Sequence, residues 1–141
     1  MELKPYLLKV RYYETDKMGI VHHSNFIRWL EEARLDWLEQ LGISFADLEK
    51  RGVVSPVMAV SCQYKRPVFY GDTVKIVAKV ANYNGKTFDF IYELYNAASD
   101  KLLATGSTTH CFTNLEGRAA SVNTLFPELH DLLIKLSGSA G

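Results

Sequence analysis

Apolar residues recur along this chain of 141 residues at two different spacings, and each spacing predicts a different element. Between Phe26 and Leu41 the apolar positions lie three or four residues apart, which is typical of one long amphipathic helix. Ser24 or Asn25 is expected to cap its start through a side-chain oxygen, and Gly42 is expected to end it. The apolar stripe consists of Phe26, Leu30, Ala33, Trp37 and Leu41, widened by Ile27, Trp29 and Leu38.

Most of the remaining chain alternates between apolar and polar residues, which is the pattern of half-buried strands. Asn84-Gly85 predicts a hairpin with a type I′ turn, and "YGDT" and "AASDK" predict two further turns. We therefore expect an antiparallel meander of about five strands, followed by a last helix over roughly Pro127 to Leu136. The predicted strands cover residues 6–10, 58–64, 74–80, 88–94 and 103–113.

A single apolar helix and an antiparallel sheet must cover each other, because neither can bury its apolar face alone. The predicted fold class is α+β, with a curled antiparallel sheet wrapped around one long central helix, in a single domain of residues 1–141. In such a roll the loop before the helix lies near the helix N-terminus. We expect Asp16 to lie beside the unpaired N–H groups of the first turn, an arrangement suited to acyl transfer.

Charge and composition exclude several classes of partner. Sixteen basic and sixteen acidic side chains give a formal net charge of zero, which argues against nucleic acid or an anionic membrane as the main partner. No apolar run approaches the roughly 20 residues of a membrane helix, and residues 1–10 lack the features of a signal peptide. These patterns predict a soluble cytoplasmic protein. Cys62 and Cys111 lack C-x-x-C spacing and are predicted to be buried free thiols.

The segment "TDKMGIVHHSNF" before the helix carries the most specific motif. Its pattern is Thr-Asp, two residues, Gly, a Val-bearing pair, two positions that often carry an aromatic residue or His, and Ser or Asn. Supporting motifs are "WLEEAR", "CQYKRPVFYGD" and "NGKTF". By these motifs the sequence resembles the hotdog-fold acyl-CoA thioesterases, in the branch of 4-hydroxybenzoyl-CoA thioesterase and the YbgC-like enzymes. The resemblance covers essentially the whole chain and implies the hotdog fold.

The resemblance also implies a role for each matching position. Asp16 would be the catalytic carboxylate, acting either as a nucleophile or as a general base that activates water. The backbone N–H of His23 matches the oxyanion-stabilising position, and its side chain would help to place water or the thioester carbonyl. Tyr13 would face the same pocket in a supporting role, and Gly19 would allow a turn that a Cβ could obstruct. No cofactor is implied.

Lys65, Arg66 and Lys86 are the candidate residues for binding the phosphate groups of coenzyme A through charge-assisted hydrogen bonds. The alternative is that they are solvated cations that protect sheet edges from pairing. The implied substrate is an acyl-CoA or an acyl-carrier-protein thioester, and its acyl group is left open between aromatic and fatty. The resemblance further implies a homodimer or homotetramer, because the site in this family lies between subunits.

Several other interpretations compete with these roles. Asp16 could simply stabilise a turn by accepting hydrogen bonds from its neighbours' N–H groups. Asp16, His22 and His23 could bind a metal, but adjacent residues point apart and no third His is near, so no metal is expected. A hotdog hydratase or dehydratase could use Glu31 or Glu32 on the helix. The chain could also be a non-catalytic module that binds acyl groups or proteins.

Overall fold

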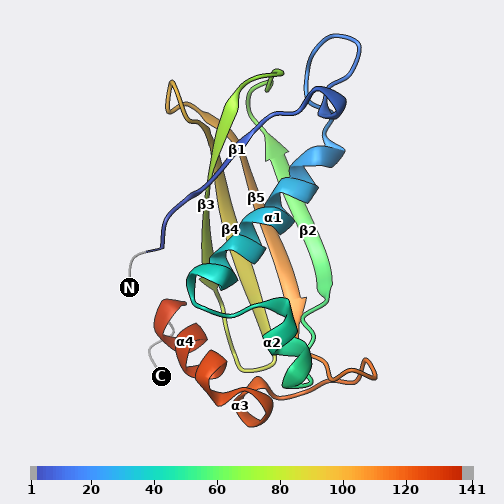
Figure 1. Ribbon diagram of the computed structural model, residues 1–141, viewed down its shortest axis with the longest axis vertical. Coiled ribbons are helices and arrows are strands. Elements are labelled where there is room, and N and C mark those ends of the chain that lie inside the picture. Colours follow the sequence, from blue (N-terminus) through green and yellow to red (C-terminus); the bar gives the residue numbers. More distant parts are fainter. Residues whose placement is uncertain (1–2, 138–141) are drawn as a thin grey trace.

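The computed structural model describes residues 3–137, and its centre is one antiparallel sheet of five strands curled around a long helix (Figure 1). The helix, α1, spans Ser24–Gln40 and runs diagonally across one face of the sheet. The predicted α+β architecture, a curled sheet around one central helix, is confirmed. The strands are β1 (Tyr6–Lys9), β2 (Val57–Tyr64), β3 (Thr73–Ala81), β4 (Thr87–Asn96) and β5 (Leu102–Cys111).

The strand order across the sheet is β1-β3-β4-β5-β2, so only β3, β4 and β5 form the predicted meander. The predicted direct pairing of β2 with β3 is wrong. β2 pairs with β5 at one edge of the sheet, where Tyr64 lies opposite Ala104, and residues 65–72 carry the chain across the end of the sheet to β3. Alternating apolar residues identify a strand, but they do not identify its neighbour.

β3 and β4 form the predicted hairpin, but its turn is not of type I′. That turn needs positive φ at both central residues. Gly85 has a φ of +93°, whereas Asn84 is not among the residues with positive φ. Instead, the side-chain oxygen of Asn84 accepts hydrogen bonds from the N–H groups of Lys86 at 2.9 Å and Thr87 at 2.8 Å. The asparagine side chain therefore stabilises this turn directly.

α1 packs the predicted apolar stripe against the inner face of the sheet, and burial of each large side chain contributes about 1.5–3 kcal/mol. Ile27 is the exception, because it was expected to widen the stripe and is exposed. Gly106 on β5 allows the close approach of the helix, since a Cβ there would lie 3.1 Å from both Leu30 Cδ1 and the Ser61 carbonyl oxygen. The buried residues of the stripe are Phe26, Trp29, Leu30, Ala33, Trp37 and Leu38.

The start of α1 differs from the prediction. His23, and not Ser24 or Asn25, occupies the N-cap position, and its side chain makes no capping hydrogen bond. His22 Nδ1 takes that role, because it accepts a hydrogen bond from the Ser24 N–H at 3.2 Å. The Asn25 side chain instead donates to the Glu14 carbonyl oxygen at 2.9 Å. The helix end follows the prediction, since Gly42 has a φ of +80° just beyond it.

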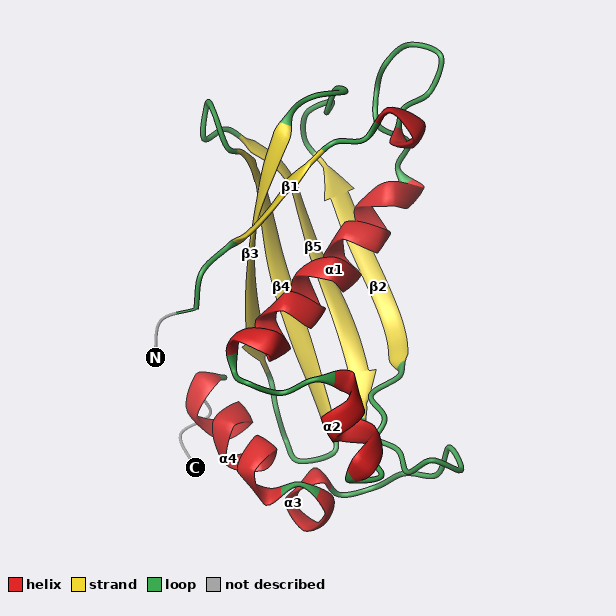
Figure 2. Ribbon diagram, viewed as in Figure 1, coloured by secondary structure: helices red, strands yellow, loops and turns green. Residues whose placement is uncertain are grey.

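Three short helices gather at the end of the roll away from the start of α1 (Figure 2). The sequence predicted α4, Pro127–Leu136, but neither α2, Phe45–Lys50, nor α3, Val122–Leu125. Leu129 and Leu133 of α4 are buried and close the core at this end. Within residues 3–137, every helix is too short or too polar to cross a membrane.

Both cysteines are free thiols, as predicted, but they are half-buried rather than buried. Cys62 lies on β2 and Cys111 is the last residue of β5. Burial raises the pKa of the Cys62 thiol, which keeps this thiol protonated and weakly nucleophilic at neutral pH.

Candidate active site

The loop that leads into α1 is a narrow turn closed by backbone hydrogen bonds, at the upper right of Figure 1. Thr15 forms a bridge with Val21, and the Asp16 N–H donates to the Ile20 carbonyl oxygen at 2.8 Å. Gly19 has a φ of +77°, which explains why the predicted turn needs glycine at this position. The two arms of the loop therefore run side by side up to the helix N-terminus.

Asp16 is exposed at this loop, and one of its carboxylate oxygens is used by the loop itself. Oδ1 accepts hydrogen bonds from the N–H groups of Met18 at 2.8 Å and Ile20 at 3.3 Å. The donors to this oxygen thus belong to the loop and not to the first turn of α1, where the sequence had placed Asp16. Oδ2 has no hydrogen-bond partner within residues 3–137. One oxygen fixes the loop, and the other is available for chemistry.

The backbone of His23 presents an N–H group at the start of α1. The N–H groups of the next three residues are already occupied, by His22 Nδ1 at 3.2 Å, the His22 carbonyl at 3.0 Å and the His23 carbonyl at 3.2 Å. The His23 N–H has no acceptor among the described residues 3–137. The dipole of the 17-residue helix adds positive potential at this position. The geometry therefore leaves one oriented donor for an anion or a developing oxyanion.

A groove of about 290 Å³, called here the His23 groove, opens between the start of α1 and the end of β2. Tyr64 forms part of its wall, since its hydroxyl donates to the His23 carbonyl oxygen at 3.3 Å and its ring packs edge-on against Phe26 at 4.9 Å. Apolar and aromatic side chains line most of the groove, with two cations at one side. The lining residues are Ile20, Val21, His23, Phe26, Tyr64, Lys65, Arg66, Pro67 and Val68.

The groove brings together only part of the predicted site. Lys65 and Arg66, which the sequence predicted to bind coenzyme A, line the groove beside His23. Tyr13 is 75% exposed, and neither Tyr13 nor the exposed Asp16 is among the residues that line the groove. Lys86 lies in the turn between β3 and β4, whereas Lys65 follows β2 at the other end of the sheet. The strands between them span about seven residues, roughly 23 Å, so Lys86 does not belong to this cationic pair within one chain.

Glu14, which joins the loop to the helix, was not among the residues predicted from the sequence. Its side chain is buried, and its oxygens accept hydrogen bonds from the Arg11 N–H and from Trp29 Nε1, each at 2.7 Å. Its carbonyl accepts from the His22 N–H and from Asn25 Nδ2, each at 2.9 Å. An acid two residues from Asp16 in a polar loop carries no signal of burial in the sequence. The available signal was Trp29 on the predicted helix, because a buried indole N–H needs an acceptor and Glu14 lies in the loop that precedes this helix.

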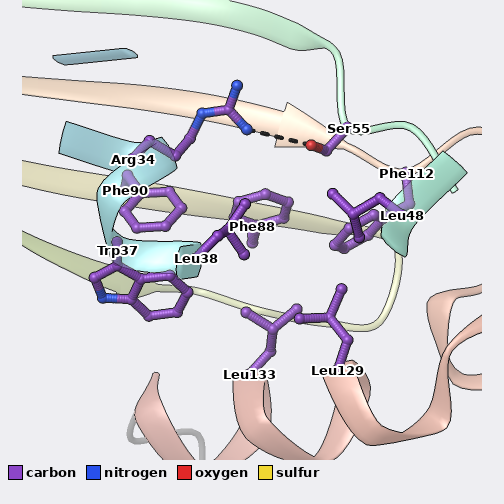
Figure 3. Close-up of a pocket in the computed structure, with 10 residues that line it drawn as sticks. All are labelled: Arg34, Trp37, Leu38, Leu48, Ser55, Phe88, Phe90, Phe112, Leu129 and Leu133. Atoms are coloured by element: carbon purple, nitrogen blue, oxygen red, sulfur yellow. Dashed lines mark hydrogen bonds between the residues drawn. The ribbon is translucent and has the colours of Figure 1, made fainter. Parts of the chain in front are cut away.

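A second cavity lies at the other end of the roll and is too small for an acyl group (Figure 3). Its volume is about 20 Å³, enough for about one water molecule. Arg34 is its charged residue, and the guanidinium binds Ser55 Oγ at 3.2 Å and Glu31 at 2.9 Å. The other lining residues are Trp37, Leu38, Leu48, Phe88, Phe90, Phe112, Leu129 and Leu133.

The acids proposed for a hydratase are both engaged in ion pairs. Glu31 pairs with Arg34 at 2.9 Å, and Glu32 pairs with Arg11 at 3.6 Å. Neither lines the His23 groove. Residues 3–137 contain no group of three His, Cys, Asp or Glu side chains arranged to hold a metal ion. The His22 and His23 rings stack on each other at 4.2 Å.

The fold and the groove at the helix N-terminus define a hotdog protein, and comparison with known proteins identifies its family. Residues 10–131 match the thioesterase-like superfamily, and the chain belongs to it. YneP of Bacillus subtilis, whose name assigns it provisionally to the acyl-CoA thioesterases, is 35% identical over 123 residues, 87% of this chain and 89% of YneP. The DHNA-CoA thioesterase from Staphylococcus aureus has a TM-score of 0.89 and 34% identity, covering 96% of this chain and 91% of that one. The 1,4-dihydroxy-2-naphthoyl-CoA hydrolase of Thermosynechococcus vestitus is 27% identical over 117 residues, 82% of this chain and 80% of that protein.

These findings confirm the hotdog fold, the thioesterase family and the enzyme class that the loop motif predicted. The protein is a thioester hydrolase of the acyl-CoA type. The relatives compared here are named as hydrolases, so they lend no support to the hydratase alternative.

Proposed function

We propose that the enzyme hydrolyses an aromatic acyl-CoA in the His23 groove, using the Asp16 carboxylate and the His23 N–H. The observation that carries the proposal is the free N–H at the start of α1, which faces no acceptor within residues 3–137 and belongs to a groove with aromatic walls and two cations. A thioester carbonyl has little resonance stabilisation, so a carboxylate and an oriented donor suffice for its hydrolysis without a metal.

In the proposed reaction the thioester carbonyl oxygen accepts a hydrogen bond from the His23 N–H, which strengthens as negative charge develops on that oxygen. Asp16 Oδ2 then acts in one of two ways. It either removes a proton from the attacking water, or attacks the carbonyl carbon to form a mixed anhydride that water hydrolyses. Both routes break the C–S bond, release coenzyme A as the thiol and yield the free acid.

An aromatic acyl group fits the walls of the groove. The rings of Phe26 and Tyr64 meet edge-on at 4.9 Å, and His23 and Tyr64 meet edge-on at 6.3 Å. Such walls favour edge-to-face contact with another aromatic ring. The names of the relatives point the same way, since two of them act on DHNA-CoA or 1,4-dihydroxy-2-naphthoyl-CoA. We therefore propose a bicyclic or hydroxylated aromatic acyl-CoA as the substrate class.

Lys65 and Arg66 are proposed to bind the phosphate groups of coenzyme A at the mouth of the groove. Neither forms an ion pair within residues 3–137, so their charges are available to a ligand. A carrier-protein thioester would present a phosphate to the same cations. Lys86 would reach a coenzyme A molecule only if that molecule were bound by another subunit. The cytoplasmic location stays a prediction.

The proposed enzyme is a homo-oligomer in which β2 meets β2 of a second copy. β2 is an edge strand, and its outer side is not paired within residues 3–137. Its apolar residues Val57, Met58 and Val60 are 45%, 60% and 43% exposed. An unpaired apolar edge of this length favours pairing with another strand. A second copy at this edge would lie next to Tyr64 and would cover one side of the His23 groove.

The first experiment compares wild type with Asp16→Asn on benzoyl, naphthoyl, short-chain and long-chain acyl-CoAs, following thiol release. The asparagine side-chain oxygen can still accept from Met18 and Ile20, so the loop is retained and only the charge is lost. We expect kcat to fall by about 10²–10⁴-fold with no change in thermal stability. Asp131→Asn, an exposed acid on α4, serves as the matched control. Turnover near wild type in Asp16→Asn would rule out the proposed chemistry.

A further inference from the structure

Glu14 is a charged side chain in an almost completely buried position. Only 4% of the residue is exposed, yet the carboxylate lies beside the candidate active site, two residues before Asp16. A buried carboxylate is costly unless hydrogen bonds or opposite charges compensate it. The protein would avoid that cost with an apolar residue here if the position only filled space.

The two carboxylate oxygens each hold a different segment of the chain. Oε1 accepts the Arg11 N–H at 2.7 Å, from the segment that follows β1. Oε2 accepts Trp29 Nε1–H at 2.7 Å, from the second turn of α1. The Arg11 guanidinium lies 3.4 Å from Oε2 and supplies the compensating charge. One side chain thus fixes the distance between the loop and the helix.

The backbone of Glu14 continues this arrangement to the proposed oxyanion donor. Its carbonyl oxygen accepts the His22 N–H and Asn25 Nδ2–H, each at 2.9 Å. His22 is joined to His23 by the peptide unit that carries the His23 N–H. On the other side, Tyr64 holds the His23 carbonyl at 3.3 Å. The direction of the His23 N–H is therefore set by contacts on both sides, and Glu14 supplies those on the loop side.

We propose that Glu14 is a positioning residue for thioester hydrolysis, acting through the Trp29 indole and the His22–His23 peptide to aim the His23 N–H at the oxyanion. This inference rests on the proposed function, because it assumes that the His23 N–H stabilises the transition state. Glu14 touches no substrate. Its effect is geometric and appears in the step in which charge develops on the carbonyl oxygen.

The position requires both oxygens of a glutamate. Glutamine has one oxygen and one NH₂ group, so it can accept from either the Arg11 N–H or the Trp29 indole and must turn a donor toward the other. We therefore expect Glu14→Gln to lower kcat by about 10–100-fold, since small misplacements of a catalytic group carry losses of this size. KM should change less than about 3-fold, because the hydrogen bond from this N–H is weak to the neutral carbonyl of the bound substrate and strong only to the developing oxyanion.

Trp29→Phe tests the same contact from the helix, because it removes the indole N–H and keeps an aromatic ring in the core. If both residues act through one hydrogen bond, the double variant should have a kcat close to that of the slower single variant, not the product of the two losses. Amide hydrogen exchange gives a direct readout, and we expect faster exchange in both variants at the His22 N–H, which donates to the Glu14 carbonyl oxygen. Losses in kcat that multiply would contradict a shared route.

Leu133→Ala is the control for simple destabilisation, since this buried leucine lies on α4 at the far end of the roll. It should lower the thermal midpoint while leaving kcat per folded molecule unchanged. Wild-type kcat in Glu14→Gln, or the same loss of kcat in Leu133→Ala, would overturn the positioning role. Including Asp16→Asn separates the two proposals. If Asp16→Asn is inactive and Glu14→Gln is unimpaired, only the positioning role fails; if Asp16→Asn is active, the proposed function fails.

Discussion

The stability of the fold should fall as the pH is lowered from neutral to 5, and His110 should be responsible for a definable part of that loss. His110 lies on β5 and is fully buried. Its Nε2 is hydrogen-bonded to Thr108 Oγ1 at 2.8 Å, and its ring stacks on Phe88 at 4.8 Å. Burial, reinforced by the positive charge of Arg34, lowers the pKa of His110 from 6.5 to about 4. The Ser55 backbone, Glu31 and Asp89 oppose this lowering of the pKa only in part.

The sign and size of the effect follow from this pKa. Between pH 6.5 and about 4 the unfolded chain binds a proton at His110 that the folded chain does not, so protonation favours unfolding. The contribution is fully present above pH 6.5 and is lost as the pH falls toward 4. A pKa difference of about 2.5 corresponds to about 3 kcal/mol in total, of which about 2 kcal/mol is lost by pH 5.

Urea unfolding at pH 7.5 and pH 5.0, at one fixed protein concentration, measures this loss in wild type and in His110→Gln. Glutamine does not titrate and can still reach Thr108 with its amide. Other groups contribute equally to both proteins, so the free energy of unfolding of wild type should fall by about 2 kcal/mol more than that of the variant. Equal losses in the two proteins would refute the conclusion that His110 is held neutral by burial.

Two further predictions concern the proposed ligand and the proposed interface. Arg66→Glu should raise KM for acyl-CoA about tenfold, with little change in kcat and a smaller effect at high salt. Arg118→Glu, on a distant exposed loop, should leave KM unchanged. Steady-state kinetics at two salt concentrations measure both variants, and an unchanged KM in Arg66→Glu would remove this residue from the site. Val60→Lys should shift the sedimentation of the protein toward that of the monomer. Ile91→Lys changes an exposed residue on the interior strand β4 and should leave the sedimentation unchanged. An unaltered oligomer in Val60→Lys would place the interface elsewhere.

Local patterns in the sequence were sufficient for the elements that define the fold. The apolar spacing from Phe26 to Leu41 predicted α1, and alternation predicted β3, β4 and β5, because both patterns report burial of one face. β2 alternates as well, although its large apolar residues are exposed. The pairing of β2 was not predictable in this way, since it depends on contacts 40 or more residues apart, such as Tyr64 with Ala104. α2 was missed although Ser44 and Asp47 form a capping box, because six residues are too few to show helical spacing.

The candidate site was predictable where its residues are close in sequence. His23 was identified from the loop motif, and the adjacent Lys65 and Arg66 reached the same groove. Lys86 was grouped with them on its charge. The sequence did not show that Lys86 lies at the opposite end of the sheet from Lys65. The hydrogen bonds of Asp16 Oδ1 within its own loop were foreseen only as the alternative interpretation, and the catalytic role of Asp16 stays a prediction.

The crossing of β2 to the far edge of the sheet also bears on how the protein assembles. The hairpins β3–β4 and β4–β5 join neighbouring segments, whereas β3 and β4 separate β2 from its partner β5 in the chain. Contacts between distant segments carry the larger loop-closure entropy and form slowly. β2 should therefore be among the last strands to dock during folding. Because β2 pairs with β5 along one edge and makes the proposed subunit contact with the other, its docking would complete the monomer and present the association surface in the same step.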